Sequence, residues 1–183
     1  MAEIYLARHG ETEANAEGRV QGWLDPPLNE RGRDQARQLA IEVEPLGLRS
    51  IWTSQLRRAL ETAQIVADAL GLGKPRIDER FAESRRGAWE GKLLREIERD
   101  DPEGWHAWQR GGADFRFPGG GESLGEHAER MEAALAEVAN GAAPALVVCH
   151  GGSVRCAIAS RRPEGLLGFS RIAVPNASVT KLP

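Results

Sequence analysis

The chain has 183 residues, of which 41% are hydrophobic and 28% are charged, and its formal net charge is −3. This length fits one domain with a sizeable core, and the composition is that of a globular protein, which excludes wholesale disorder and a fibrous repeat. No stretch approaches the ~18 consecutive apolar residues of a membrane span, the N-terminus lacks the pattern of a signal peptide, and the small negative charge argues against sequence-independent binding of nucleic acid. We therefore expect a cytoplasmic protein that binds neither nucleic acid nor membranes.

The first elements in chain order are a strand and a helix. Residues 4–7 form a short apolar run before a polar, Gly-containing segment, which is typical of a buried strand that leads into a loop. From Asn29 onward, apolar residues recur at helical spacing until Pro45 and Gly47 interrupt the pattern. This segment is predicted to be an amphipathic helix.

The same alternation then repeats. Residues 49–53 are predicted to form a second strand, and Ser54 is predicted to cap the helix that follows it. Gly71 and Gly73 end this helix, and residues 76–78 form a third short strand.

The last third of the chain contains the longest continuous apolar strand, residues 145–149. A short helix is expected over residues 153–160, and residues 171–174 with 177–180 are predicted to form a closing hairpin. Strands that alternate with helices predict an α/β layered fold.

Residues 84–143 interrupt this alternation. The segment is rich in helical patterns, proline and glycine and has no obvious strand, so we predict an insertion that covers the core of a single domain spanning residues 1–183. Ser123 has the character of a helix start, whereas His106 and His127 are expected at the surface. The insertion also holds four aromatic residues that we expect to form its small core: Trp105, Trp108, Phe115 and Phe117.

The two cysteines, Cys149 and Cys156, lie among apolar residues without a Cys or His partner at the spacing of metal ligands. Both are predicted to be small buried side chains, and neither a zinc site nor a disulfide is expected.

Two His-Gly pairs follow predicted strands. Ligands of open α/β sheets bind beyond the carboxyl ends of the strands, where loops converge. His9 and Gly10 follow the first strand, and His150 and Gly151 follow the late apolar strand. Residues 141 positions apart are therefore expected to face one pocket.

Residues 8–15 read Arg-His-Gly-Glu-Thr-Glu-Ala-Asn, which resembles the signature of the histidine phosphatase superfamily, also called the phosphoglycerate mutase-like family. Four further matches in the same order extend the resemblance over nearly the whole chain: residues 22–32, residues 54–63, Glu83 with residues 87–91, and residues 150–152. The resemblance implies a three-layer α/β/α fold with a mostly parallel central sheet and a mainly helical insertion, at about residues 84–143, over the active site.

The resemblance also implies two roles in the reaction. His9 would be the nucleophile that forms a phosphohistidine, and Glu83 would donate the leaving-group proton and later act as base for water. We expect the negative charge of the phosphate to raise the pKa of Glu83. No metal and no other cofactor is expected.

Three residues would hold the transferred phosphoryl group, whose charge is spread over its nonbridging oxygens. By resemblance these are Arg8, Arg57 and His150, and the planar fork of arginine suits such a role. We choose Arg57 over Arg58 because the family's arginine is taken to stand three residues after the serine at position 54. A helix argument alone would not choose between the two.

Asn15 is expected to add an amide donor, and Gly151 belongs to the same phosphate site by resemblance. The backbone around Gln21 and Gly22 is expected to help hold phosphate or substrate. For these two residues, a turn before the Asp-Pro-Pro segment that follows is an equally good interpretation.

The segment after Glu83 reads Ser-Arg-Arg-Gly-Ala-Trp-Glu-Gly, whereas the mutases of this family typically continue with Arg-His-Tyr-Gly. This version resembles the phosphatase branch, and the chain is shorter than typical mutases. We predict hydrolysis of a small phosphorylated metabolite, such as a sugar phosphate or a phosphoglycerate derivative, with Arg85 and Arg86 as candidates to bind an acidic substrate.

Two alternatives stay open at this point. The same residues would serve a cofactor-dependent phosphoglycerate mutase, and some relatives keep the fold as noncatalytic phosphate-binding modules. The oligomeric state is also open, with a homodimer as one option.

Overall fold

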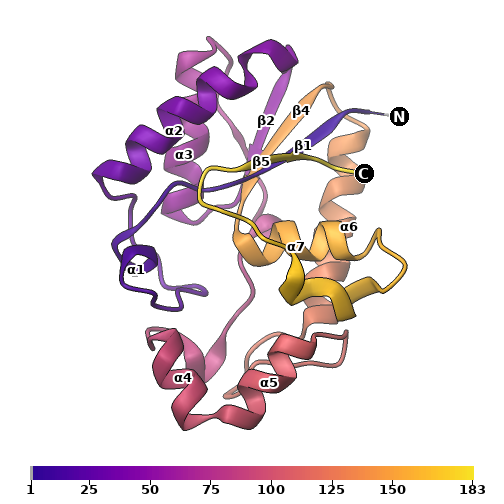
Figure 1. Ribbon diagram of the computed structural model, residues 1–183. Coiled ribbons are helices and arrows are strands. Elements are labelled where there is room, and N and C mark those ends of the chain that lie inside the picture. Colours follow the sequence, from indigo (N-terminus) through magenta and orange to yellow (C-terminus); the bar gives the residue numbers. More distant parts are fainter. Residues whose placement is uncertain (1) are drawn as a thin grey trace.

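The computed structural model describes residues 2–183 (Figure 1). Its centre is a sheet of five strands in the order β3-β2-β4-β1-β5. The strands are β1 (Ile4–Arg8), β2 (Ser50–Thr53), β3 (Arg76–Ile77), β4 (Ala145–Cys149) and β5 (Val179–Lys181). Strand β5 pairs antiparallel with β1, and the other pairs are parallel. The predicted α/β fold with a mostly parallel sheet is confirmed.

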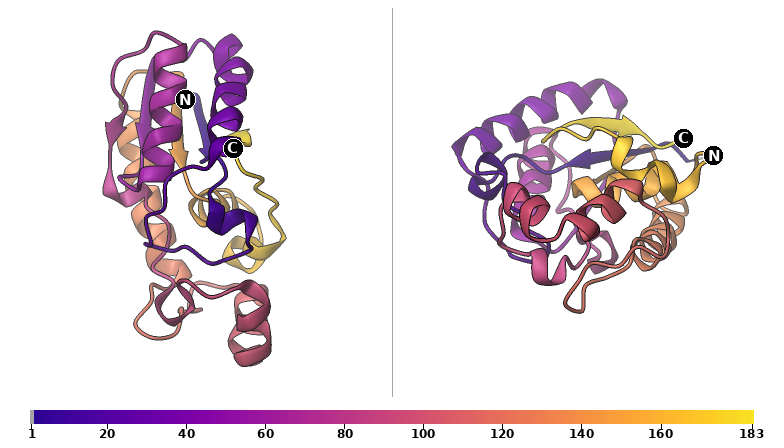
Figure 2. Two further views of the ribbon diagram at one scale, coloured as in Figure 1. Left: turned by 90° about the vertical axis from the view of Figure 1, so that its left-hand side faces the viewer. Right: turned by 60° about the horizontal axis from the view of Figure 1, so that its bottom comes forward.

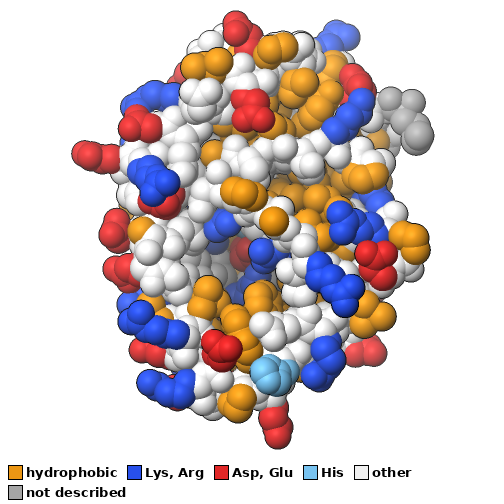
Figure 3. All heavy atoms as spheres, viewed as in Figure 1, with side chains coloured by type: hydrophobic (Ala, Val, Ile, Leu, Met, Phe, Trp, Pro, Cys, Tyr) orange, Lys and Arg blue, Asp and Glu red, His pale blue; other side chains and the backbone are white. Residues whose placement is uncertain are grey.

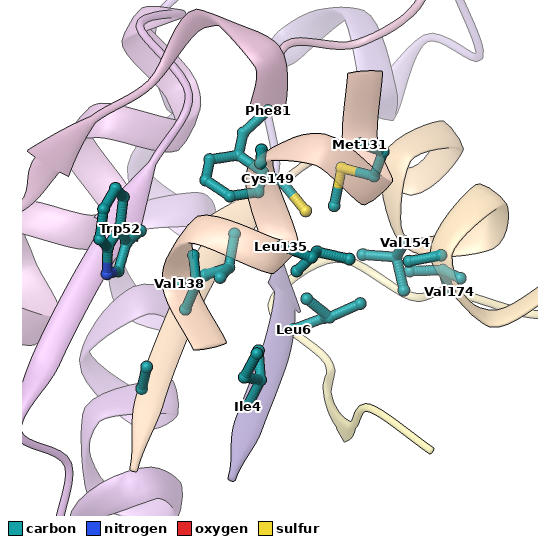
Figure 4. Packing of buried hydrophobic residues seen from close by; sticks show 14 of the residues in the cluster. Ile4, Leu6, Trp52, Phe81, Met131, Leu135, Val138, Cys149, Val154 and Val174 are labelled. Carbon is teal, nitrogen blue, oxygen red and sulfur yellow. The ribbon is translucent and has the colours of Figure 1, made fainter. Parts of the chain in front are cut away.

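Helices cover both faces of this sheet. They are α2 (Glu30–Val43), α3 (Arg57–Ala69), α6 (Leu124–Ala139) and α7 (Gly151–Ala159). Successive side chains of a strand point to opposite faces: Leu146 and Val148 pack against α2 and α3, whereas Val147 and Cys149 pack against α6 and α7. Figure 4 shows this second core around Leu6, with Leu135 above it. The continuous apolar run of β4 is thus explained by burial on both sides.

The long helices begin at the predicted polar residues. Asn29 accepts a hydrogen bond from the Gly32 N–H at 2.8 Å at the start of α2. At the start of α6, Ser123 and Glu126 form a capping box in which each side chain accepts from the other's backbone N–H. Both helix starts are confirmed.

The cap, which we define as residues 85–123, contains α4 (Leu94–Asp100) and α5 (Pro102–Arg110). It lies below the sheet in Figure 1 and in the left view of Figure 2. Four aromatic rings surround Trp89, with centroid distances between 5.5 and 6.5 Å: Trp105, Trp108, Phe115 and Phe117. They form the small core that was predicted for this segment.

The predicted insertion over residues 84–143 is too long. Met131, Leu135 and Val138 on α6 are buried in the core of the sheet together with Leu6 and Val147. Their helical spacing places them on one side of α6, so this helix is a layer of the sheet and not part of the cap.

The predicted hairpin over residues 171–174 and 177–180 is wrong. Residues 165–171 form a 3₁₀ helix, and only β5 pairs with the sheet. The carbonyls of Ile172 and Val174 accept instead from the guanidinium groups of Arg155 and Arg8, both at 2.8 Å. Backbone groups that arginines satisfy in this way do not need a partner strand.

Two smaller expectations were also tested. Cys149 and Cys156 are free and buried, as predicted, and burial raises the pKa of both thiols. Among residues 2–183, no helix combines the length and the apolar character that crossing a bilayer requires.

Candidate active site

The two His-Gly segments meet because β1 and β4 are neighbours in the sheet. Arg8 pairs with Cys149 at the ends of these parallel strands, so the next residues emerge side by side. The backbone N–H of His9 donates to the Cys149 carbonyl at 3.0 Å, and the rings of His9 and His150 lie 5.2 Å apart. Both histidines are buried, and the expected convergence of the two segments is present.

A cavity of about 250 Å³ opens at this edge of the sheet. The face in Figure 3 is hollowed near its middle, and Lys or Arg side chains gather at the hollow. The cavity is lined by Arg8, His9, Asn15, Arg19, Val20, Gln21, Gly22, Arg58, Glu83, Arg86, Leu94, Trp108, Gly151, Gly152 and Arg155. A larger groove of about 910 Å³ lies elsewhere, around Ile4 and Leu182, but its described lining contains no histidine, so size alone would locate the wrong site.

His9 is held as a neutral nucleophile. Its Nδ1 lies 2.7 Å from the Gly10 carbonyl oxygen, and because a carbonyl only accepts, Nδ1 must carry the proton. The lone pair of Nε2 is then available for attack. Burial, with further contributions from Arg58 and Arg8, holds the pKa of His9 well below its usual value, so the ring is uncharged near neutral pH.

Several buried nitrogen atoms in or beside the cavity have no partner among residues 2–183. They are Nε of Arg8 and Nε of Arg58, which line the cavity, and both ring nitrogens of His150, which is buried beside His9 outside the lining. A neutral imidazole donates from one of its two nitrogens. Burial lowers the pKa of each arginine to about 10, which leaves both charged at neutral pH. Buried donors are normally paired, and unpaired donors that converge beside a histidine form a suitable site for a tetrahedral anion.

Arg58, not Arg57, is the second arginine of the site. The side chain of Arg57 is exposed and does not line the cavity, whereas Arg58 is 1% exposed. Arg58 donates to the carbonyls of Gly22 and Leu24 at 2.8 and 2.7 Å. Consecutive helix residues point about 100° apart, so only one of two adjacent arginines can face the cavity.

The start of α3 explains this choice. Ser54 does not cap the helix as predicted: its Oγ accepts from the Leu56 N–H within the preceding turn, and Leu56 is the N-cap residue. The helix therefore begins at Arg57, whose backbone N–H donates to Asp25. Arg58 is its second residue and points inward.

Glu83 is fixed by donors on both carboxylate oxygens. Oε2 accepts from the Gly152 N–H at 3.0 Å, Oε1 accepts from the Ser84 N–H at 2.9 Å, and the Arg86 guanidinium lies 3.4 Å from Oε1. Burial acts to raise the pKa of Glu83, but its polar and charged neighbours together, with Arg86 the strongest among them and the Gly152 N–H contributing, hold the pKa well below its usual value. The predicted rise therefore does not come from the protein's own groups and would require the charge of a phosphate.

The remaining predicted residues also line the cavity. Asn15 Oδ1 accepts from the Thr12 N–H and from Asn176 Nδ2, both at 3.2 Å, which orients the Asn15 amide. Gln21 Oε1 accepts from Thr12 Oγ1 at 3.0 Å. Gly22 has φ of +54°, and an added Cβ would lie 2.3 Å from Glu90 Oε1, so glycine is required there. Gly22 turns the chain and presents its carbonyl to Arg58, so the turn interpretation is confirmed, while binding of phosphate or substrate by this backbone stays a prediction.

Three more arginines line the cavity: Arg19, Arg86 and Arg155. Of the two arginines proposed for an acidic substrate, only Arg86 is there, since the Arg85 guanidinium stacks 3.6 Å over the Trp23 ring outside the lining. Arg155 was missed. Its spacing of four residues from Gly151 on a helix is the signal that could have identified it.

His127 is buried, contrary to prediction, whereas His106 is exposed as expected. His127 belongs to the side of α6 that carries Met131, four residues later, and therefore faces the core. Its Nε2 lies 3.0 Å from Ser153 Oγ. This pair lies directly behind the segment that carries Glu83, because Ser153 Oγ also contacts the Ala82 carbonyl at 3.1 Å.

Comparison with known proteins gives a consistent result. A model of the histidine phosphatase superfamily (branch 1) matches residues 4–183. A probable phosphoglycerate mutase of Enterobacter sp. (strain 638) is 37% identical over 186 residues, which cover 100% of this chain and 85% of that protein. Phosphoglycerate mutase-like protein 4 of Arabidopsis thaliana is 36% identical over 166 residues, which cover 89% and 72% of the two chains.

Similar solved structures carry phosphatase names. The mycobacterial glucosyl-3-phosphoglycerate phosphatase in complex with VO3 superposes with a TM-score of 0.87 and 31% identity, covering 99% of this chain and 90% of that one. A phosphoserine phosphatase variant from Entamoeba histolytica in complex with phosphoserine has a TM-score of 0.86 and 25% identity, with the same coverage.

Proposed function

Because the chain belongs to the histidine phosphatase superfamily (branch 1), we propose that it hydrolyses phosphomonoesters of small metabolites through a phosphohistidine formed on His9. The observation that carries the proposal is the neutral imidazole of His9, oriented by the Gly10 carbonyl and set beside unpaired donors of Arg8, Arg58 and His150. This arrangement supplies a nucleophile and the donors that a transferred phosphoryl group needs.

In the first step, Nε2 of His9 attacks phosphorus and the bond from phosphorus to the ester oxygen breaks. The departing alkoxide takes a proton from Glu83. Arg8, Arg58 and His150 hold the nonbridging oxygens, where negative charge accumulates. The phosphate dianion opposes the effect of Arg86 on Glu83 and so favours the protonated carboxyl group that this step requires.

In the second step, water attacks the phosphohistidine. The Glu83 carboxylate accepts a proton from this water, the bond from phosphorus to nitrogen breaks, and the electron pair returns to His9. Inorganic phosphate leaves, and the protein returns to its starting protonation state. No step requires a metal ion or another cofactor.

The charge of the cavity favours an acidic substrate. Its described lining holds five arginines but one carboxylate, Glu83. Arg8 and Arg58 suffice for a phosphate. Arg86 is paired with Glu83 and Arg19 with Glu17, so Arg155 is the arginine that leaves positive charge for a second anionic group. The volume of about 250 Å³ suits a small molecule of the phosphoglycerate or phosphoserine type, and both of the similar solved phosphatases are named for substrates of this kind.

A mutase is the second candidate, since one relative is named a probable phosphoglycerate mutase and another a phosphoglycerate mutase-like protein. A mutase would return the phosphoryl group to a bound acceptor and not to water. It would convert 3-phosphoglycerate to 2-phosphoglycerate with stimulation by 2,3-bisphosphoglycerate, and NMR detection of the two isomers separates this outcome from release of inorganic phosphate.

The proposal is tested by assaying phosphate release from p-nitrophenyl phosphate and 3-phosphoglycerate, with and without EDTA. We expect turnover that EDTA does not change and that His9→Ala lowers by about 10⁴-fold or more. His106→Ala, on the exposed side of α5, is the matched control and should retain full activity. An active His9→Ala variant would refute the nucleophile, and a wild-type protein that releases no phosphate from any ester would support the noncatalytic alternative.

A further inference from the structure

Arg130, a residue of α6, binds the backbone of the segment that carries Glu83, residues 80–83. Arg130 Nη1 donates to the carbonyls of Arg80 and Ala82 at 2.6 and 2.8 Å, and Nη2 donates to the carbonyl of Glu83 itself at 3.1 Å. Arg130 does not line the cavity. It therefore contacts the backbone of the candidate acid without reaching the substrate.

The guanidinium of Arg130 has no donor left for another role. An arginine has five N–H groups, and the remaining two bind Glu122, with Nε to Oε1 at 2.6 Å and Nη2 to Oε2 at 2.8 Å. Both side chains are mostly buried, at 20% and 12% exposed. A fully paired, mostly buried fork of this kind has one orientation, so it fixes the three carbonyls that it contacts.

Glu122 adds a link to the cap. It is the residue before the capping Ser123, and its backbone N–H donates to the Arg85 carbonyl at 2.9 Å, just beyond the candidate acid. Residues on both sides of Glu83 are thus bonded to the same two residues, to the Arg130 side chain before it and to the Glu122 backbone after it. On the opposite side, the Glu83 carboxylate is bound by the Gly152 N–H.

We infer that Arg130, oriented by Glu122, is a positioning residue that aligns the carboxyl group of Glu83 with the leaving oxygen. The inference rests on the proposed function, since it assigns Glu83 the proton transfer. Without Arg130, the three carbonyls lose their charged partner and residues 80–83 can shift. A displacement of about 1 Å is enough to impair proton transfer. His9 and the phosphate donors stay in place, because Arg8 lies on β1, Arg58 lies on α3, and the two histidines directly follow β1 and β4.

This role has a specific kinetic signature. A strongly basic alkoxide needs a proton in order to leave, whereas weakly basic p-nitrophenolate leaves without one. For Arg130→Gln, we expect kcat/KM for glycerol 3-phosphate to fall roughly tenfold to hundredfold, and kcat/KM for p-nitrophenyl phosphate to change less than about threefold. The ratio kcat/KM is chosen because it reports phosphoryl transfer and not the later hydrolysis of the phosphohistidine.

Three further variants complete the experiment. Glu83→Gln removes the candidate acid itself and so gives the largest expected difference between the losses of kcat/KM on the two esters. Arg161→Gln is the matched control. Arg161 also pairs with a glutamate of α6, Glu132, but it does not contact residues 80–83. Glu122→Gln keeps Arg130 but weakens the ion pair that orients it. It should change the ratio of the kcat/KM values for the two esters in the same direction as Arg130→Gln, by a smaller factor. If Arg130→Gln does not fold, Glu122→Gln decides the question.

Equal losses on both esters, or unchanged hydrolysis of glycerol 3-phosphate, would overturn the positioning role. This result is distinct from failure of the proposed function, which would appear as absence of phosphate release by the wild-type protein from either ester.

Discussion

The sheet edge and the outer wall of the cavity hold their side chains in different ways. At the sheet edge, the side chains of Arg8, His9 and Arg58 are each bonded to a backbone carbonyl, those of Val174, Gly10 and Gly22. On the outer wall, Leu94 and Trp108 belong to the cap, which packs around the Trp89 cluster and not on the sheet. From this difference we expect the sheet edge to determine the chemistry and the outer wall to influence the choice of substrate.

The largest effect expected from this comparison separates two adjacent residues. Arg58→Gln removes a preorganised donor to the phosphate and should lower kcat/KM by about 10²–10³-fold on every ester. Arg57→Gln removes only an exposed charge and should change kcat/KM less than about twofold.

Thermal unfolding of both variants is measured in parallel, because Arg58 also holds the Gly22 and Leu24 carbonyls. A larger loss of activity in Arg57→Gln than in Arg58→Gln, with both proteins folded, would contradict the placement of Arg58 at the sheet edge.

The positions of the two histidines could be predicted from the sequence because they depend on strand ends alone. His9 and His150 each follow an apolar run, and parallel strands bring their carboxyl ends to one edge. Arg57 and Arg58 show where this reasoning stops. They differ by one residue, or about 100° around the helix, and the choice depends on a turn at Ser54 that involves a single hydrogen bond.

Contacts between distant segments could not be predicted from local patterns. The expected strand over residues 171–174 is absent because Arg8 and Arg155 bind its carbonyls. His127 looks like a surface residue among its charged neighbours, but its helix position faces Ser153. In each case the partner lies far away in the sequence, so only the folded chain reveals the contact.

The next largest effect concerns the buried histidine behind the sheet edge. Burial, assisted by the charge of Arg130, lowers the pKa of His127 to about 3, whereas an unfolded chain restores a value near 6.5. Between these values the unfolded chain binds a proton that the folded chain excludes, so stability is full above about pH 6.5 and falls as the pH decreases.

At pH 5 the shifted pKa of His127 makes the free energy of unfolding about 2 kcal/mol smaller than it is well above pH 6.5. Between pH 7 and pH 5, the free energy of unfolding measured with urea should therefore fall by about 2 kcal/mol less in His127→Asn than in wild type. Comparing each protein with itself at the two pH values cancels any general destabilisation by the substitution. An unchanged pH dependence would mean that His127 is protonated in the folded protein, and the buried layer behind Glu83 would then need another explanation.

The smallest expected effect concerns an arginine that lines the cavity from α7 and not from the cap. Arg155 lies in the second turn of α7, lines the cavity and is held by the Ile172 carbonyl at 2.8 Å. If it binds the second anion of an acidic substrate, Arg155→Gln should lower kcat/KM about tenfold for 3-phosphoglycerate but less than about twofold for glycerol 3-phosphate, which lacks the carboxylate. Arg110→Gln, an exposed arginine at the end of α5 outside the lining, should change neither value. Equal losses on both esters would assign Arg155 to the phosphate itself and would contradict its role in binding a second anionic group.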